Sequence, residues 1–383
     1  MHLTLGRWLG FALLTLHVSA CAPPNQGAAG RGAVLVVGVV NPASLEWVGG
    51  GHGRHRMALA RPLEHLAAGL GGSVITLTAG SGGGGRMELD VLWPGSASHP
   101  PAAVRRLGGV DTSGVARLAA DGQRYAVVAY QRRLEAQPLT GTAPPAADAR
   151  CPLLVVDLLV VESVPVAAPC RAEERVRSLA LEPAGGLAGN VPRPGAHAYV
   201  GLEDTRHGGE FGGRLLVVAL PSGAVVDALA LSGGPVDLRL APAGPSGPAA
   251  LYVLEQAGGA GGIVPTPERG RVLVLDPLTL DVLGDHALSA HAARLVPAPD
   301  GRSAFLVRED TVQRLDLATG TVRQIARLPG RVVAAEVFGE RLYLASPETR
   351  VLWVLDVRTG SRQPDLRLAG HPVKLALAAH RPG

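Results

Sequence analysis

The densest group of side chains with metal-binding or acid–base chemistry lies in the segment GLEDTRHGGEFGG at 201–213. Glu203, Asp204, His207 and Glu210 fall there within eight residues. Carboxylates and an imidazole together are ligands that a divalent cation accepts. The neighbouring glycines fix no geometry, so the segment equally suits a polar loop that contacts a partner, or a plain exposed loop. We expect a candidate ligand-binding loop through Asp204, His207 and Glu210, and we assign no metal to it.

A second, looser group of histidines occurs around GGGHGRHRM, with His52, His55 and His65. Its His-x-x-His spacing lacks the glutamate and the helical setting of a zinc protease site, so it carries no metal assignment either. The glycine run GSGGGGR at 80–86 lacks the Gly-Lys-Ser/Thr ending and the following helix of a phosphate-binding loop. Because no nucleophile elbow, haem-attachment motif or Cys-x-x-Cys pair occurs, the sequence predicts no cofactor and provides no catalytic motif.

The N-terminus has the three parts of an export signal. Arg7 precedes an apolar run at 8–16, and small residues at 18–20 lead to Cys21. This ending resembles the lipobox of bacterial lipoproteins, although an ordinary signal peptide with an incidental cysteine would share the same charged and apolar parts.

The lipobox resemblance implies that 1–20 is removed as a signal peptide and that Cys21 is acylated. Residues 21–31 are then expected to form a flexible tether from a lipid anchor. Ala22, in place of the aspartate that retains some lipoproteins in the inner membrane, implies the outer membrane of a bacterial cell envelope. The protein would face the periplasm or the cell surface.

The composition favours an all-β domain built around aliphatic side chains. Hydrophobic residues make up 47% of the 383 and charged residues 18%, which excludes a mainly disordered chain. Aromatic residues are only 3%, whereas there are 51 glycines and 31 prolines, so short aliphatic strands joined by many turns are expected. The net charge is +4, but the arginines are scattered and not clustered, so the sequence predicts no nucleic-acid binding.

Three C-terminal segments repeat one pattern. They are VLVLDPLTLDVLGDHAL at 272–288, VQRLDLATGTVRQIARL at 312–328 and VLWVLDVRTGSRQPDLRL at 351–368. Their aspartates, Asp276, Asp316 and Asp356, are each 40 residues apart. A period near 40 residues with several short strands per unit is typical of a β-propeller blade. The Asp-x-x-Thr-Gly steps supply turn residues, with glycine where a positive φ is favoured.

With this repeat, the chain resembles the YVTN family of seven-bladed β-propellers. LYVLEQ at 251–256 and LYLASPE at 342–348 correspond to the tyrosine-containing strand of the family pattern. PVDLRLAPAG at 235–244 and HAARLVPAPDG at 291–301 correspond to its innermost strand. The resemblance implies an all-β ring of four-stranded antiparallel blades, and it specifies strands and turns without specifying chemistry.

Applied to the whole chain, the pattern predicts seven blades in a single domain over 32–379. Innermost strands are expected near 62–69, 114–120, 174–182, 235–242, 291–297, 331–337 and 371–378. Second strands are expected near 33–40, 73–79, 124–130, 197–203, 250–255, 303–308 and 341–346. The chain thus begins with a second strand and ends with an innermost one. The C-terminal strand should pair with the N-terminal strands and close a monomeric ring without a free edge.

Cys151 and Cys170 bracket two predicted strands of one blade. Outside the cytoplasm such a pair is expected to form a disulfide. In the blade pattern, Cys151 begins the third strand and Cys170 ends the outermost one, so the bond would staple the rim of the ring. On the entropic model it would stabilise the fold by about 3 kcal/mol.

The residues that lead into the innermost strands are expected at the mouth of the central channel. These further candidate ligand-binding residues are Asp111, Glu174, Arg175, His291, Arg331 and His371. Their mixture of acid, arginine and histidine suits an anionic or sugar-like ligand, and it equally suits solvated channel walls.

The expected links between second and third strands are long at 80–85, 131–150, 204–213 and 256–270. Long links in a compact domain commonly carry function, and propellers bind partners through such loops. The sequence therefore predicts a membrane-anchored, non-catalytic lipoprotein whose loop-rich face binds a protein or a cell-envelope polymer. The alternative is a periplasmic, lactonase-like hydrolase with its site at the channel mouth, which depends on fold resemblance alone.

Overall fold

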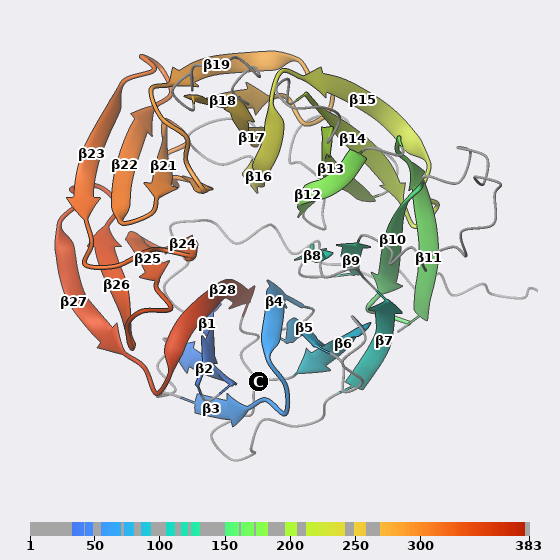
Figure 1. Ribbon diagram of the computed structural model, residues 1–383, viewed down its shortest axis with the longest axis horizontal. Coiled ribbons are helices and arrows are strands. Elements are labelled where there is room, and N and C mark those ends of the chain that lie inside the picture. Colours follow the sequence, from blue (N-terminus) through green and yellow to red (C-terminus); the bar gives the residue numbers. More distant parts are fainter. Residues whose placement is uncertain are drawn as a thin grey trace, which may run out of the picture.

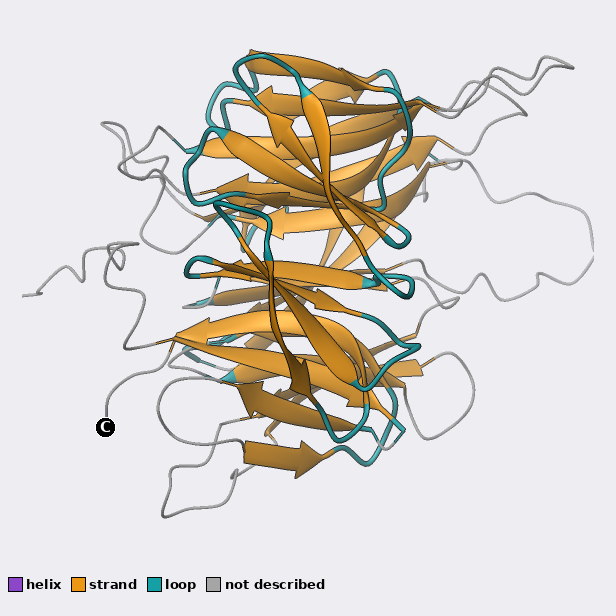
Figure 2. Cartoon of the chain, turned by 90° about the vertical axis from the view of Figure 1, so that its left-hand side faces the viewer, coloured by secondary structure: helices purple, strands orange, loops and turns teal. Residues whose placement is uncertain are grey.

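Seven four-stranded antiparallel sheets stand around a central axis as the blades of a ring (Figure 1). The computed structural model describes residues 33–41, 43–48, 55–69, 73–79, 86–92, 105–111, 116–121, 124–130, 150–160, 162–171, 174–182, 196–204, 212–241, 249–257 and 269–379. All regular structure in these segments is β-strand, and the strands run between the two faces of the ring (Figure 2). None of the described segments forms a helix long and apolar enough to span a membrane.

Blades 1 to 4 contain the strands of the N-terminal part of the chain together with its last strand, and each blade is described from its innermost to its outermost strand. Blade 1 consists of β28 (His371–Ala379), β1 (Ala33–Val40), β2 (Ser44–Val48) and β3 (His55–Ala58). Blade 2 consists of β4 (Leu63–Ala68), β5 (Val74–Ala79), β6 (Arg86–Leu92) and β7 (Arg105–Asp111). Blade 3 consists of β8 (Ala116–Ala120), β9 (Tyr125–Tyr130), β10 (Arg150–Asp157) and β11 (Glu162–Pro169). Blade 4 consists of β12 (Glu174–Leu181), β13 (Ala196–Asp204), β14 (Gly213–Leu220) and β15 (Val225–Leu231).

The remaining three blades belong to the C-terminal half of the chain. Blade 5 consists of β16 (Gly234–Ala241), β17 (Ala250–Ala257), β18 (Arg269–Leu275) and β19 (Val282–Leu288). Blade 6 consists of β20 (Arg294–Pro297), β21 (Ser303–Arg308), β22 (Thr311–Asp316) and β23 (Val322–Arg327). Blade 7 consists of β24 (Ala334–Phe338), β25 (Arg341–Ala345), β26 (Val351–Asp356) and β27 (Arg362–Arg367). Every innermost and second strand expected from the sequence is confirmed within a few residues.

The two ends of the chain close the ring by sharing blade 1. The C-terminal strand β28 pairs antiparallel with β1, from Ala33 opposite Ala379 to Val40 opposite His371. In Figure 1 the red β28 therefore lies beside the blue β1. The predicted closure is confirmed, and the long edge of β1 that would otherwise be unpaired is covered by β28.

The predicted place of the cysteines in blade 3 is also confirmed at the level of the backbone. Cys151 is the second residue of the third strand, β10, and lies opposite Ala168 of β11. Cys170 directly follows β11, the outermost strand, and is disulfide-bonded. The side chain of Cys151 lies outside the described residues, so the pairing of the two cysteines stays a prediction. The same holds for the signal peptide, the tether and Cys21.

The core lies between neighbouring blades, because the middle strands of each blade are covered on both faces. Phe305 on β21 and Trp353 on β26 are at most 1% exposed and belong to one cluster shared by blades 6 and 7. The outermost strands β15 and β19 instead alternate between more and less exposed residues along most of their length. Continuous aliphatic runs therefore mark middle strands, and alternating runs mark the rim.

The repeated aspartates begin the turns between the third and the outermost strands. In Asp276, Asp316 and Asp356, Oδ1 accepts hydrogen bonds from the backbone N–H groups two and three residues ahead, at 2.7–3.2 Å. Gly320 and Gly360 follow with φ of 70° and 72°, the left-handed conformation that the pattern predicts.

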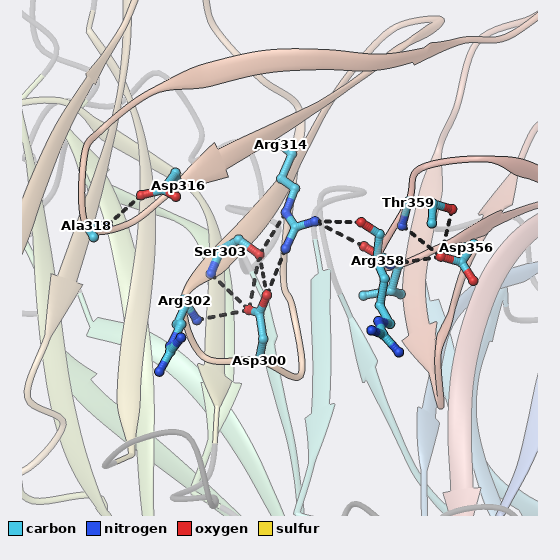
Figure 3. Close-up of polar contacts among 10 residues, drawn as sticks. Asp300, Arg302, Ser303, Arg314, Asp316, Ala318, Asp356, Arg358 and Thr359 are labelled. Carbon is cyan, nitrogen blue, oxygen red and sulfur yellow. Dashed lines mark hydrogen bonds and ion pairs between the residues drawn. The ribbon is translucent and has the colours of Figure 1, made fainter.

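Arg314 on β22 joins one of these turns to the neighbouring blade (Figure 3). Its guanidinium donates to the carboxylate of Asp300 at 2.8 Å and to the hydroxyl of Ser303 at 3.1 Å, both in blade 6. It also donates to the backbone oxygen of Arg358 at 3.1 Å, in the turn of blade 7. Contacts of this kind fix the placement of each blade against the next.

Candidate functional site

A cavity of about 390 Å³ lies in the central channel, where the seven innermost strands face one another. Each of these strands contributes at least one ionisable side chain to its wall. The ionisable lining residues are Glu64 and His65 on β4, Arg117 on β8, Arg177 on β12, Asp237 and Arg239 on β16, Arg294 on β20, Glu336 on β24, and Lys374 on β28. The channel wall is therefore highly charged, whereas the spaces between blades are filled by aliphatic side chains.

The alternation of side chains along each innermost strand explains this arrangement. On β12, Val176 and Ala180 are buried against the neighbouring blades, whereas Arg177 and Leu179 are half-buried and line the cavity. Successive residues of a regular strand point to opposite faces, so alternate residues of an innermost strand are available to the channel. A charged residue at such a position enters the cavity wall. The irregular register between Leu63 and His65 on β4 interrupts this alternation, and both Glu64 and His65 line the cavity.

Three cations in the wall form no ion pair with any carboxylate in the described part of the chain: Arg117, Arg294 and Lys374. Burial, and then the positive charge of Arg294, lower the pKa of Lys374. Attraction to Glu64 acts on this pKa in the opposite direction, and the charge of Arg117 adds a smaller lowering. Burial and the charges of Arg177 and Arg294 likewise lower the pKa of Arg117. The protein therefore holds several like charges close together inside a partly enclosed space.

His65 lies beside these cations and stays neutral. Burial, and then the charges of Lys374 and Arg117, lower its pKa from 6.5 to about 3, although a hydrogen bond to the backbone of Ala116 acts in the opposite direction. At neutral pH the imidazole therefore adds no charge to the cavity.

In blades 5 and 7, on either side of Arg294, one arginine is shared by two carboxylates. Arg239 lies between two carboxylates, with Nη1 3.2 Å from Glu336 and Nε 3.6 Å from Asp237. Asp237 also accepts a hydrogen bond from the backbone N–H of Leu295 at 3.0 Å. Burial raises the pKa of Glu336 despite the charge of Arg239. This network crosses from blade 5 to blade 7 and ties the ring together through the channel.

The predicted channel-mouth residues lie outside the lining of the cavity. Glu174 forms a two-fold ion pair with Arg214 at 2.7 and 2.6 Å. Burial alone would raise the pKa of Glu174, but these bonds from Arg214 hold it below its usual range. Arg175 pairs with Glu203 at 2.8 Å. Both predicted residues thus belong to ion pairs in blade 4, beside the end of β13.

The other four lie in links or at strand ends. Asp111 ends β7, the outermost strand of blade 2, and its side chain is outside the described residues. His291 and Arg331 precede β20 and β24, and the backbone N–H of Arg331 donates to Glu348 at 3.3 Å. His371 is the first residue of β28.

The predicted loop through Asp204, His207 and Glu210 is described only at its start. Asp204 ends β13, opposite Glu174 in the register, and its backbone N–H donates to the oxygen of Gly212 at 3.0 Å. His207 and Glu210 lie outside the described residues. In the segments that the structure describes, no three His, Cys, Asp or Glu side chains are placed to hold a metal ion.

The three cations of the channel without an ion pair in the described chain are not among the residues predicted from the sequence, although the sequence holds a signal for them. Arg117 in ARLAA, Arg294 in RLVP and Lys374 in HPVKLALAA are single charges within aliphatic innermost strands. Such a charge would be costly between blades, so the channel is the one place where it can be accommodated. Lys374 is also the only lysine of the sequence.

Fold and cavity together define the protein as a seven-bladed β-propeller with a charged central channel. No family model and no curated protein sequence matches the chain, so membership of the YVTN family stays a prediction. Among solved structures, apo AztD from Citrobacter koseri is 14% identical, with a TM-score of 0.50, and the match covers 91% of this chain and 99% of that one. Sqt1 from Saccharomyces cerevisiae is 10% identical, with a TM-score of 0.52, covering 88% and 85%. Likeness at such low identity shows the fold alone.

Proposed function

We propose that the chain is an exported, lipid-anchored propeller that works by binding, and that its loop-rich face holds a protein or a polymer of the cell envelope. The observation that carries the proposal is the unequal length of the links between second and third strands. In blades 2 to 5 these links span 80–85, 131–149, 205–212 and 258–268. In blades 1, 6 and 7 they span only 41–43, 309–310 and 346–350.

The antiparallel order of each blade directs all of these links to one face. The links that join one blade to the next leave from that same face, at the start of the innermost strands. Three consecutive blades, 3 to 5, therefore carry the longest links on one side of one face, whereas the link of blade 2 at 80–85 is close in length to that of blade 7 at 346–350. A rigid ring that presents variable links in this way is suited to recognising a large partner.

The anchor is tested by replacing the cysteine that would carry it. Wild-type protein should incorporate a labelled fatty acid and partition into a detergent phase, whereas Cys21→Ser should do neither. An unlabelled wild-type protein in a lipoprotein-producing bacterial host would remove the anchor from the proposal.

The binding face is tested by cross-linking in native membranes and mass spectrometry of the bound proteins or polymers. Two variants replace 131–149 or 205–211 by a short glycine–serine link, and Arg302→Glu, on the opposite face, is the control. We expect wild type and Arg302→Glu each to retain a partner in near-stoichiometric amount. At least one of the two shortened variants should no longer retain that partner. A partner that persists in both, or none in wild type, contradicts the proposal. Lactone turnover that disappears on substitution of Glu174 or Arg175 would favour the hydrolase alternative.

A further inference from the structure

We propose that the central cavity is a binding site for a small oxyanion carrying at least two negative charges, such as a phosphate compound or a polycarboxylate. Arg117, Arg294 and Lys374 would bind its anionic groups. This site is distinct from the loop-rich face and does not depend on it.

The charge of the wall is the first observation. Four arginines, one lysine and three carboxylates line the cavity, together with the neutral His65. Arg239 is shared between Asp237 and Glu336. The Nε atom of Arg177 lies 3.4 Å from the carboxylate of Glu203, so Arg177 is paired with a carboxylate outside the cavity lining. Arg117, Arg294 and Lys374 are the cations that form no ion pair among the described residues, and Glu64, the third carboxylate, attracts Lys374 without pairing with it. An anionic ligand would supply the further negative charge that these cations lack.

The pose of the two arginines is the second observation. In Arg117, Nε donates to the backbone oxygen of Arg177 at 2.7 Å, and Nη1 donates to that of Ala116 at 2.8 Å. In Arg294, Nε donates to the backbone oxygen of Val333 at 3.3 Å, and Nη1 to that of Ala293 at 2.9 Å. Each guanidinium thus reaches the next blade with Nε and its own preceding residue with Nη1.

This shared pose matters because carbonyl oxygens hold the guanidinium groups without cancelling their charge. In the described chain, Nη2 of Arg117, Nη2 of Arg294 and Nζ of Lys374 are left without a hydrogen-bond partner. They come from blades 3, 6 and 1, on different sides of the channel. Donors that are fixed before the ligand arrives lose little conformational entropy on binding it.

The size and chemistry of the cavity set the ligand class. A volume of about 390 Å³ suits a small molecule. Guanidinium groups pair with the planar oxygens of carboxylates and phosphates, and three cations favour more than one negative charge. Asp237 and Glu336, in the blades on either side of Arg294, disfavour a ligand that is anionic over its whole surface, and hydroxyl groups would suit these positions.

Calorimetric titration of the full chain with citrate and with inorganic pyrophosphate, at constant ionic strength, tests the site. We expect saturable 1:1 binding of at least one probe, weakened on the order of tenfold to a hundredfold in the double variant Arg117→Gln/Lys374→Gln. The control is Arg323→Gln, which removes an exposed arginine from the outermost strand β23.

The outcome of the titration also identifies the ligand class. Binding of citrate alone assigns carboxylate chemistry, and binding of pyrophosphate alone assigns phosphate chemistry. No saturable binding of either, or equal binding by the double variant, overturns the proposal.

A second measurement does not depend on the folding of the double variant. Pyridoxal phosphate carries an anionic group and an aldehyde that condenses with the amine of Lys374, releasing water, and borohydride reduces the resulting imine. Because Lys374 is the only lysine, peptide mass spectrometry assigns the label without ambiguity. We expect labelling of Lys374 in the wild-type chain, and protection by whichever probe binds. Absence of labelling, or labelling that no anion suppresses, overturns the proposal.

Discussion

At the scale of single residues, the left-handed turns show how the repeat tolerates exceptions. Gly320 and Gly360 have φ of 70° and 72°, and the corresponding position of the first turn is Leu280, with φ of 59°. Leu280 is only 6% exposed and belongs to the core cluster between blades 4 and 5. Its burial offsets the cost of a left-handed conformation, whereas the glycines adopt that conformation with little strain.

Gly320→Ala should therefore destabilise the protein by about 1 kcal/mol, as measured by urea unfolding. The nearest atom to an added Cβ, Nδ1 of His286, would be 3.5 Å away, so the cost comes from the backbone and not from a clash. Gly212→Ala is the control, because its added Cβ meets nothing within 4 Å and its φ is not left-handed. Equal losses in the two variants would contradict this explanation.

His65 should couple the stability of the protein to pH. Burial and the charges of Lys374 and Arg117 lower its pKa from 6.5 to about 3. Between these values the unfolded chain binds a proton at this position and the folded chain does not, so folding is opposed as the pH falls. The stabilising contribution is complete above pH 6.5 and is progressively lost toward pH 3.

His65→Gln removes this titration. Between pH 6 and pH 4, we expect wild type to lose up to about 1.4 kcal/mol more stability per pH unit than the variant. Urea unfolding of both proteins at several pH values measures the difference in slope, in which the contributions of all other groups cancel. Parallel curves would show that His65 is protonated in the folded protein.

At the scale of the elements, the ring depends on a strand from the far end of the chain. The strand β28 pairs with β1 along its whole length, and it also supplies Lys374 to the channel. Removing 371–383 exposes the edge of β1 and leaves blade 1 without its innermost strand, so we expect loss of the cooperative thermal transition. Removing only 380–383, after the end of β28, is the control and should leave the melting temperature unchanged. A cooperative transition in the shorter protein would contradict closure by β28.

The elements were largely predictable from the sequence, whereas the cavity was not. Each strand carries its own local signal, an aliphatic run between turn residues, and the repeated Asp316 and Asp356 set the phase of the blades. The direction of one side chain within an innermost strand depends instead on register, since a shift by one residue moves it to the other face. Arg117 and Lys374 are far apart in the sequence, and only the closed ring brings them to one cavity. Glu174, a predicted channel residue, is held in blade 4 by Arg214, a contact that no local pattern indicates.

At the scale of the whole molecule, closing the ring concentrates like charges that the unfolded chain keeps apart. The charges of Arg294 and Arg117 act on Lys374 inside a cavity partly shielded from water, and Glu64 offsets them only in part. Bringing like charges together in a partly enclosed space opposes folding, so the energetic cost of the cluster should be measurable.

Lys374→Met keeps the length and the apolar stem of the side chain and removes its charge. We expect the ligand-free variant to be more stable than wild type by about 1 kcal/mol, because the cost of burying the charge and the repulsion from Arg294 are both removed. Arg323→Met, which removes an exposed charge from β23, is the control and should change stability by less than about 0.5 kcal/mol. Saturating citrate or pyrophosphate should raise the melting temperature of wild type more than that of Lys374→Met, because a ligand stabilises the state that binds it. A less stable Lys374→Met would mean that attraction to Glu64 outweighs the repulsion, and that the channel is balanced without a ligand.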